Sequence, residues 1–398
     1  MTVIRWASIG IAALMTIGGA SAVSAGEPIE RSGNTYHQAV CARGQGAGVA
    51  RCFAHVVVDA RGTEFDGKAN ASPSITPSGY GPADLRSAYN VAAGGSATTT
   101  VAIVDAYGYS NAESDLGVYR SQYGIAACTT ANGCFHKVNQ TGGTSYPRNN
   151  TGWEQETALD LDMVSAMCPG CHILLVEANS ASLADLAAAE NEAAALGAHV
   201  ISNSYGGGET GSSTYASAYN HNGVAITVST GDSGYGVQFP ASAPTVVAVG
   251  GTNLTRASNS RGWAEVAWTS GGSGCSSIYA KPTWQKDALC TARMEADIAA
   301  VADPSTGVAV YGPSGSGKGS SWLVFGGTSV SAPLLGGMYG LKASTVNAAA
   351  SIYAAPAGSL NDVTGGTNGS CGGTYFCTAG AGYDGPTGLG SPNGTAPL

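Results

Sequence analysis

Charged residues are scarce in this sequence. Of its 398 residues only 11% are Asp, Glu, Lys or Arg, and the 17 basic and 26 acidic residues give a formal net charge of −9 at pH 7. The basic residues are scattered, and no Lys/Arg cluster forms the electropositive footprint that a nucleic-acid partner requires. We therefore expect no nucleic-acid partner. So low a charge density is also unusual for a cytosolic protein.

Long apolar runs are equally rare. One apolar stretch, residues 7–17, follows Arg5 and precedes the small residues VSA at 23–25. It is shorter than the roughly twenty apolar residues that a membrane-spanning helix needs. A basic residue, an apolar core and small residues in this order are typical of a secretory signal peptide. We expect a signal peptide over residues 1–25, no membrane anchor and a secreted protein.

The cysteines are even in number, ten in all, and they fall in neighbouring pairs along the chain. In an oxidising compartment disulfides are the expected state. The string CPGC at residues 168–171 is also compatible with a redox site or half of a zinc site, but no second Cys or His pair completes a tetrahedral site. The sequence leaves the connectivity open, and we expect nearest-neighbour disulfides: Cys41/Cys52, Cys128/Cys134, Cys168/Cys171, Cys275/Cys290 and Cys371/Cys377.

Short apolar runs alternate with helical patterns from about residue 80 onward. This alternation predicts a parallel sheet with helices on both faces. In such sheets the functional groups gather at the carboxyl ends of the strands. Strands are predicted at residues 98–105, 172–177, 199–204, 225–229 and 245–250, and helices at 154–167, 182–196 and 334–341.

Two regions have weaker patterns. Residues 26–78 are polar and Gly-rich apart from a strand-like run at 53–59, and we interpret them as a short N-terminal pro-segment or extension. Residues 262–319 are predicted to be rich in loops.

The sharpest motif is GGTSVSAP at residues 326–333, where small residues lead into Ser329 and an apolar helix follows. Pro333 is expected in the first helical turn, where a missing N–H does no harm. A serine at a helix start lies at the positive end of the dipole, which favours an alkoxide-like charge. A helix-capping serine is the ordinary alternative, but the whole string favours a nucleophile.

A serine nucleophile needs a base. None of the six histidines lies in a sequence context typical of a catalytic histidine. Glu156 and Asp160 stand four residues apart on the predicted 154–167 helix, and therefore on one face. The alternative is a solvated acidic face, which would also account for Glu154 and Asp162.

Three motifs together resemble the sedolisin family of serine-carboxyl peptidases: GGTSVSAP, ETALD at residues 156–160 and STGDSG at 229–234. Further similarity runs in the family's order from YGPADLRSAYN near residue 80 to the C-terminus. The resemblance implies one large catalytic domain over residues 79–398. The implied fold is α/β and subtilisin-like, with a seven-stranded parallel sheet flanked by helices.

The resemblance assigns a role to each matching residue. Ser329 matches the nucleophile, Glu156 its general base and Asp160 the carboxylate that orients this base. Asp232 matches the acid of the oxyanion hole, and a carboxyl group can donate there only when it is protonated. Asp105 matches an acid that extends the hydrogen-bond network of Glu156, although a strand-end turn residue is the alternative.

The resemblance also implies two binding sites. Ser204, Tyr205 and Gly206 resemble the strand end that pairs with the substrate backbone. The C-terminal motif resembles a site for one Ca²⁺ ion, with hard oxygen ligands: the carboxylates of Asp362 and Asp384 and the carbonyl groups of Val363, Gly380 and Gly382.

The function implied is that of an acid-acting endopeptidase that hydrolyses peptides and proteins, and we expect a monomer. The family usually has a long prodomain, and how some fifty residues would control activity here is left open. A histidine-dependent subtilisin would need His-Gly-Thr where Glu156 stands. A trypsin-like enzyme, suggested by GDSG at 231–234, would need antiparallel barrels. The alternative of another class is a catalytically inactive, secreted binding or surface protein.

Overall fold

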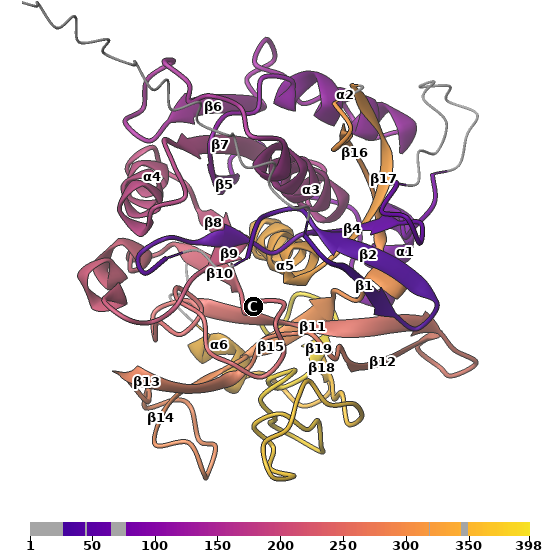
Figure 1. The fold of residues 1–398 in the computed structure, drawn as a ribbon, viewed down its shortest axis with the longest axis vertical. Coiled ribbons are helices and arrows are strands. Elements are labelled where there is room, and N and C mark those ends of the chain that lie inside the picture. The colour runs from indigo at the N-terminus through magenta and orange to yellow at the C-terminus, as the bar shows by residue number, and fades with distance from the viewer. Residues whose placement is uncertain (1–26, 44–45, 65–76, 318, 344–348) are drawn as a thin grey trace, which may run out of the picture.

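The computed structural model describes residues 27–43, 46–64, 77–317, 319–343 and 349–398. The expected signal peptide lies outside them. An eight-stranded sheet crosses the molecule in the order β12-β11-β10-β8-β5-β7-β6, with β15 also paired to β11 (Figure 1). Its strands are β5 Thr100–Ala106, β6 Phe135–Asn139, β7 His172–Ala178, β8 Val200–Asn203, β10 Ala225–Ser229, β11 Val247–Arg256, β12 Trp263–Ala267 and β15 Ile298–Val301.

Seven strands of this sheet, β6, β7, β5, β8, β10, β11 and β15, run parallel to one another. The predicted seven-stranded parallel sheet is thereby confirmed. The eighth strand, β12, is an antiparallel addition, paired with the second half of β11.

Helices cover both faces of the sheet because side chains alternate along each buried strand. On β5, Ile103 belongs to the apolar cluster that holds Leu159 of α3 and Leu334 of α5. Its neighbour Val104 belongs to the cluster that holds Leu186 of α4. The helices are α1 Pro82–Ala88, α2 Ala112–Gln122, α3 Thr151–Met167, α4 Leu183–Ala195, α5 Thr328–Lys342 and α6 Ala350–Tyr353, with 3-10 turns η1 Ser212–Thr214, η2 Ala216–Tyr219 and η3 Pro304–Thr306.

A second, antiparallel sheet joins the N-terminal region to the strand that precedes α5. Its order is β1-β2-β4-β17-β16. His55 of β4 pairs with Gly326 of β17, three residues before Ser329. Figure 1 shows these N-terminal strands, in indigo, beside α5. The strands are β1 Ile29–Ser32, β2 Thr35–Ala39, β4 His55–Val58, β16 Val308–Pro313 and β17 Ser320–Gly326.

Three two-stranded pairs complete the fold: β3 Arg51–Cys52 with β9 Tyr205–Gly206, β13 Gly274–Ala280 with β14 Ala292–Glu295, and β18 Leu360–Asn361 with β19 Ser391–Pro392. Residues 262–319 also contain the strands β12 to β16, which the sequence did not predict among the loops. These strands have only four to seven residues, so no long period marks them in the sequence.

Five disulfides link the cysteines in the nearest-neighbour pairs expected from the sequence. Within the described ranges, no helix has both the length and the apolar character needed to cross a membrane.

Candidate active site

Ser329 lies in the first turn of α5, directly after a strand–glycine–helix turn. β17 ends at Gly326, and Gly327 has a positive φ of 102° before α5 begins at Thr328. Only glycine adopts such a conformation without strain. The turn places Ser329 at the positive end of the helix dipole, where a developing negative charge is stabilised.

Pro333 lies in the second turn of α5, so its expected place in the first turn was wrong. Proline has no N–H, and the carbonyl of Ser329, four residues earlier, lacks its helical donor. The hydroxyl oxygen of Ser204 lies 3.5 Å from this carbonyl oxygen, while its single proton is donated to Asp160 Oδ1 at the shorter distance of 2.8 Å. Ser329 Oγ donates to the backbone carbonyl of Ser204 at 3.2 Å. Pro333 therefore leaves the carbonyl of Ser329 on α5 free to contact Ser204.

Glu156 and Asp160 are fully buried on α3, which packs against α5. Glu156 Oε2 accepts a hydrogen bond from the backbone N–H of Ala54 at 2.8 Å, and Asp160 Oδ1 accepts one from the Ser204 hydroxyl at 2.8 Å. Burial raises the pKa of both carboxyls well above their usual values, and the charge of Asp105 adds to both shifts. Because neighbouring buried carboxyls cannot all ionise together, this group retains protons above the ordinary range.

Ser329 and Glu156 are neighbours. A hydrogen bond with Ser329 is among the causes that lower the pKa of Glu156, against the larger effects of burial and Asp105. By hydrogen-bond geometry, however, Ser329 Oγ donates to Ser204, and Glu156 Oε1 has no partner among the described residues. A hydrogen bond from Ser329 Oγ to Glu156 would require the hydroxyl to turn away from the Ser204 carbonyl.

Asp105 lies near the carboxyl end of β5 and is also buried. Burial raises its pKa to about 7, and the charge of Glu177 adds to the shift. It therefore shares one electrostatic environment with Glu156 and Asp160.

Asp162 also lies on α3, but it does not belong to a solvated acidic face. It is 1% exposed and accepts a hydrogen bond from the backbone N–H of Tyr311 at 2.9 Å. The sequence suggested exposure because the i, i+4 pattern does not reveal that α3 is enclosed by β16 as well as by α5.

Asp232 lies in the loop after β10 and is held by the first residue of α5. Its Oδ1 accepts hydrogen bonds from the backbone N–H and the hydroxyl of Thr328, at 2.9 and 2.7 Å. Its Oδ2 faces His55 Nε2 at 3.5 Å. Burial raises the pKa of Asp232 to about 7, although the Thr328 hydrogen bonds and the charge of Arg51 oppose the shift.

The backbone edge at Ser204, Tyr205 and Gly206 is paired with another part of the chain. β3 lies antiparallel to β9, and the N–H of Phe53 donates to the carbonyl of Ser204 at 3.2 Å. The Tyr205 side chain points the other way, into the core, where its hydroxyl donates to Asn203 at 2.7 Å. These three residues thus offer backbone groups to an extended strand of the same chain, and their pairing with a peptide substrate stays a prediction.

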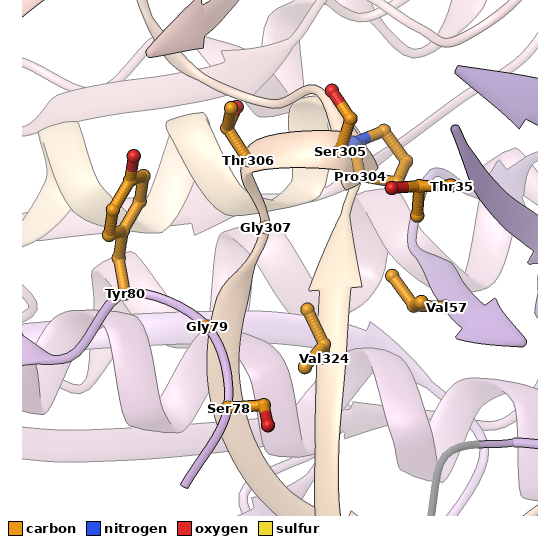
Figure 2. Close-up of a pocket in the computed structure, with 10 residues that line it drawn as sticks. All are labelled: Thr35, Val57, Ser78, Gly79, Tyr80, Pro304, Ser305, Thr306, Gly307 and Val324. Atoms are coloured by element: carbon orange, nitrogen blue, oxygen red, sulfur yellow. The ribbon is translucent and has the colours of Figure 1, made fainter. Parts of the chain in front are cut away.

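A cavity of about 420 Å³ lies apart from these residues (Figure 2). It is lined by Val57 of β4, Val324 of β17, residues 78–80, residues 304–307 and Thr35. It marks the seam between the N-terminal strands and the rest of the molecule, and none of the four candidate catalytic residues lines it.

The predicted calcium ligands lie in a C-terminal loop. Asp384 accepts hydrogen bonds from the N–H of Gly380 and from Thr387, and Asp362 accepts one from the N–H of Gly382. Burial raises the pKa of Asp384 to about 6, and the charge of Asp362 adds to the shift. Two carboxylates that converge on one glycine loop fit a hard divalent cation. Val363 follows Asp362 and is buried.

This geometry can be set beside known proteins. The sequence pattern of the subtilase family matches residues 124–352, more than half of the chain. The chain belongs to the subtilase family.

This subtilase is similar to two curated relatives. It is 29% identical to kumamolisin from Bacillus sp. (strain MN-32), over 83% of this chain and 64% of kumamolisin. It is 28% identical to sedolisin from Pseudomonas sp. (strain 101), over 79% of this chain and 60% of sedolisin. The chain thus spans less than two thirds of the length of these relatives.

A solved structure agrees with this assignment. Pseudomonas sedolisin, described as a serine-carboxyl proteinase complexed with two molecules of pseudo-iodotyrostatin, matches this subtilase with a TM-score of 0.68 at 28% identity. The match covers 80% of this chain and 96% of the solved one. The fold and the family resemblance expected from the sequence are therefore confirmed.

Sequence reasoning did not find the residues that contact the candidate catalytic groups from the N-terminal side. Ala54 donates to Glu156, His55 faces Asp232, and Phe53 pairs with Ser204. The only sequence signal was the strand-like run at 53–59. Its apolar pattern indicates a buried strand but not the surface on which it lies.

Proposed function

We propose that this subtilase is an acid-acting serine-carboxyl endopeptidase, with Ser329 as nucleophile and Glu156 as general base. One observation carries the proposal. Ser204 connects the two helices, because its carbonyl accepts from Ser329 at 3.2 Å and its hydroxyl donates to Asp160 at 2.8 Å. The nucleophile, the base and its neighbouring acid therefore lie around one backbone edge that can bind an extended peptide.

The reaction needs one ionised carboxyl group and two protonated ones. Glu156 accepts the proton of Ser329 Oγ as this oxygen attacks the peptide carbonyl, so it must be ionised. Asp160 supports the ionised state when it is protonated and donates to Glu156. Asp232 must also be protonated, because it donates to the developing oxyanion. Glu156 then passes its proton to the leaving amine, and water hydrolyses the ester on Ser329.

These needs are met at a pH above the pKa of the first coupled carboxyl to ionise and below the pKa of Asp232. The pKa of Asp232 is raised to about 7, so this carboxyl is a donor throughout the mildly acidic range. Glu156, Asp160 and Asp105 titrate as a coupled group. Once the first proton has left and given the ionised base, its negative charge raises the pKa of the other two carboxyls, which therefore keep their protons.

Replacement of the nucleophile tests the proposal. Ser329→Ala should lower the hydrolysis of denatured haemoglobin at pH 4 by about a thousandfold or more, as losses of single catalytic groups do. Ser331→Ala is the matched control, since Ser331 is buried on the same helix and only donates to the carbonyl of Thr328. Equal melting temperatures would show that both variants fold. A Ser329→Ala protein with a tenth of the wild-type rate would contradict the assignment, and a wild-type protein without any hydrolysis would favour a binding protein.

We further propose that the Asp362 and Asp384 loop binds one Ca²⁺ ion. The ion would stabilise the native state by mass action, by about 2.7 kcal/mol at a hundredfold excess over its dissociation constant. At pH 7 a chelator should lower the melting temperature of the wild type, while Asp384→Asn should melt lower and no longer respond. An unchanged melting temperature of the wild type with chelator would argue against the site.

Secretion and a monomeric state complete the proposal. The five disulfides suit an oxidising compartment. Proteins and peptides are the substrates that an open backbone edge would accept.

A further inference from the structure

We propose that the peptide bond between Phe53 and Ala54 is itself a substrate of Ser329. Until the chain cuts itself, residues 48–53 occupy the substrate cleft, by which we mean the space between residues 181–183 and β9. This inference rests on the proposed function. It assigns a self-processing site to a segment that no sequence motif marked.

On the N-terminal side of the bond, the segment is a strand between two backbone edges. On one side Ala50 N–H donates to Ala181 at 2.8 Å, and Leu183 N–H donates to Gly48 at 2.9 Å. On the other side β3 pairs with β9, which belongs to the edge predicted to bind substrate. A peptide substrate that adds a strand to a sheet edge makes the same kind of contacts.

The Phe53 side chain fills a place that glycines leave open. It is 1% exposed. A Cβ on Gly206 would come within 2.8 Å of the Phe53 ring, and a Cβ on Gly231 would lie 3.5 Å from it. The guanidinium of Arg51 lies 5.1 Å from the ring centre. The residue before the bond is therefore held by a pocket and not only by its backbone.

The two ends of the Phe53–Ala54 bond face the groups that would break it. The nitrogen of Ala54 donates to Glu156 Oε2 at 2.8 Å, so the leaving group already contacts the base that must supply its proton. The carbonyl oxygen of Phe53 would lie 1.9 Å from a Cβ on Gly327, and Asp232 Oδ2 would lie 2.6 Å from that same point. The oxygen therefore lies at the turn before Ser329, beside the acid assigned to the oxyanion.

After the bond, the chain continues as β4 and is held in place there as well. His55 and Val56 pair with Gly326 and Phe325 of β17, and β4 also pairs with β2. Both sides of the Phe53–Ala54 bond are thus fixed on the candidate site, which is the arrangement that favours an intramolecular reaction.

The reaction is an ordinary hydrolysis. Ser329 Oγ bonds to the carbonyl carbon of Phe53 and gives its proton to Glu156. The bond to nitrogen breaks, and Ala54 leaves as an amine that takes the proton from Glu156. One water then hydrolyses the ester to free Ser329 and a carboxylate on Phe53. Until this cut occurs, the cleft is closed to other peptides.

Acidification of the purified full chain tests the inference. When the protein is moved from pH 8 to pH 4, intact mass and N-terminal sequencing should show a new N-terminus at Ala54 and a fragment ending at Phe53. The rate should not depend on protein concentration, and Ser329→Ala should stay whole. Cleavage of Ser329→Ala at the same bond, or a wild type cut only elsewhere, would overturn the inference.

The same samples, tested on denatured haemoglobin, separate the two proposals. A wild-type chain that stays whole but digests haemoglobin overturns self-processing and leaves the proposed function. A chain that stays whole and digests nothing overturns self-processing alone, because an occupied cleft also prevents digestion, whereas a chain cut after Phe53 that digests nothing contradicts the proposed endopeptidase.

Two substitutions after the bond provide a second test. Ala54→Pro removes the N–H that contacts Glu156 and places the proline ring at that position, so it should slow the cut by about a hundredfold or more, the scale of a misplaced reacting bond. Such a chain should also fail to digest haemoglobin, since its cleft stays occupied. Ala54→Gly keeps the N–H and should be cut like the wild type. Equal rates for the two variants would overturn the inference. If Ala54→Pro does not fold, a synthetic peptide of residues 48–58 replaces it, and the processed wild-type enzyme should cut this peptide between Phe53 and Ala54.

Discussion

Asp232 is the residue whose protonation decides the pH range of the proposed reaction. Its Oδ1 is held by Thr328, and its Oδ2 is the oxygen next to the Phe53 carbonyl. Because a carboxylate cannot donate, the rate should fall as pH rises through its pKa of about 7. Departure of residues 48–53 exposes this carboxyl to water, so in the open enzyme the fall should begin below pH 7.

Asp232→Asn tests this role, because an amide donates at any pH. We expect a lower rate at the acid optimum, by about a hundredfold, on the scale of a perturbed oxyanion hole, and a flatter decline towards pH 8. The measurement is kcat/KM on a peptide substrate from pH 3 to pH 8. A variant whose pH profile keeps the wild-type shape would show that another group sets the alkaline limb.

The candidate residues differ in how far the sequence could reveal them. Ser329, Glu156 and Asp232 lie in strings whose residue types and order are recognisable without coordinates, and the structure brings them together. His55 and Ala54 lie in a run that signals only a strand. Their contacts with Asp232 and Glu156 depend on how β4 pairs with β17, which is a long-range choice that local pattern does not encode.

At the scale of elements, the site depends on the contact between α3 and α5, which carry the proposed base and the proposed nucleophile. A glycine allows the two helices to approach closely. A Cβ on Gly337 of α5 would come within 2.8 Å of Met167 Cβ on α3. Neither atom lies at the end of a flexible side chain, so the helices would have to move apart.

Gly337→Ala should therefore reduce stability and activity together. Overpacking of this kind costs about 1–3 kcal/mol, and a small separation of α3 from α5 should lower kcat about tenfold or more by misplacing Ser329 relative to Glu156. Gly117→Ala is the matched control, because nothing lies within 4 Å of a Cβ at that position of α2. Thermal melts and kcat check both variants, and a Gly337→Ala protein as stable and active as Gly117→Ala would contradict this account.

The elements themselves were largely predictable. The helices over 154–167 and 182–196 and most strands of the central sheet follow from long or strongly apolar patterns, and Ser182 caps α4 as a helix start requires. The strands of residues 262–319 and the N-terminal strands β1, β2 and β3 were not, because short strands receive their stability from partners distant in sequence, whereas the strand-like run at 53–59 did indicate β4.

At the scale of the whole molecule, the interior holds an unusual number of acidic groups. Burial raises the pKa of each of these fully buried carboxyls: Asp105, Glu156, Asp160, Asp162, Glu190, Asp232 and Glu295. In the unfolded chain such groups titrate near pH 4. The folded protein therefore holds more protons than the unfolded chain above pH 4, and its stability is lost as pH rises through the folded-state values.

Two buried histidines act in the opposite sense. Burial lowers the pKa of His37 to about 4 and that of His55 well below its usual value. Their contribution to the free energy of unfolding is complete above pH 6.5 and is lost as pH falls from there towards 4. Of these two kinds of group, only the carboxyls still change their proton binding above pH 6.5. The expected direction of the change in stability is therefore unambiguous there.

We therefore expect the melting temperature of Ser329→Ala, which cannot cut itself, to fall as pH is raised from 6.5 to 8. A chelator is kept present so that metal binding adds no pH dependence of its own. Asp232→Asn in the same background should fall less steeply, since it removes one of the titrating groups. A melting temperature that stays level over this interval would show that the buried carboxyls are already ionised in the folded state.

The central claim is that a carboxylate on α3, and not a histidine, activates Ser329. The most direct measurement is kcat/KM against pH for the wild type, Glu156→Gln and Glu154→Gln. Glu154 is the matched control, since it lies on the same helix, is only partly buried and hydrogen-bonds Asn149. We expect Glu154→Gln to follow the wild type, with an acid optimum, and Glu156→Gln to lose about a thousandfold or more at every pH. A Glu156→Gln enzyme within tenfold of the wild type, or a wild type most active near pH 8, would contradict the claim.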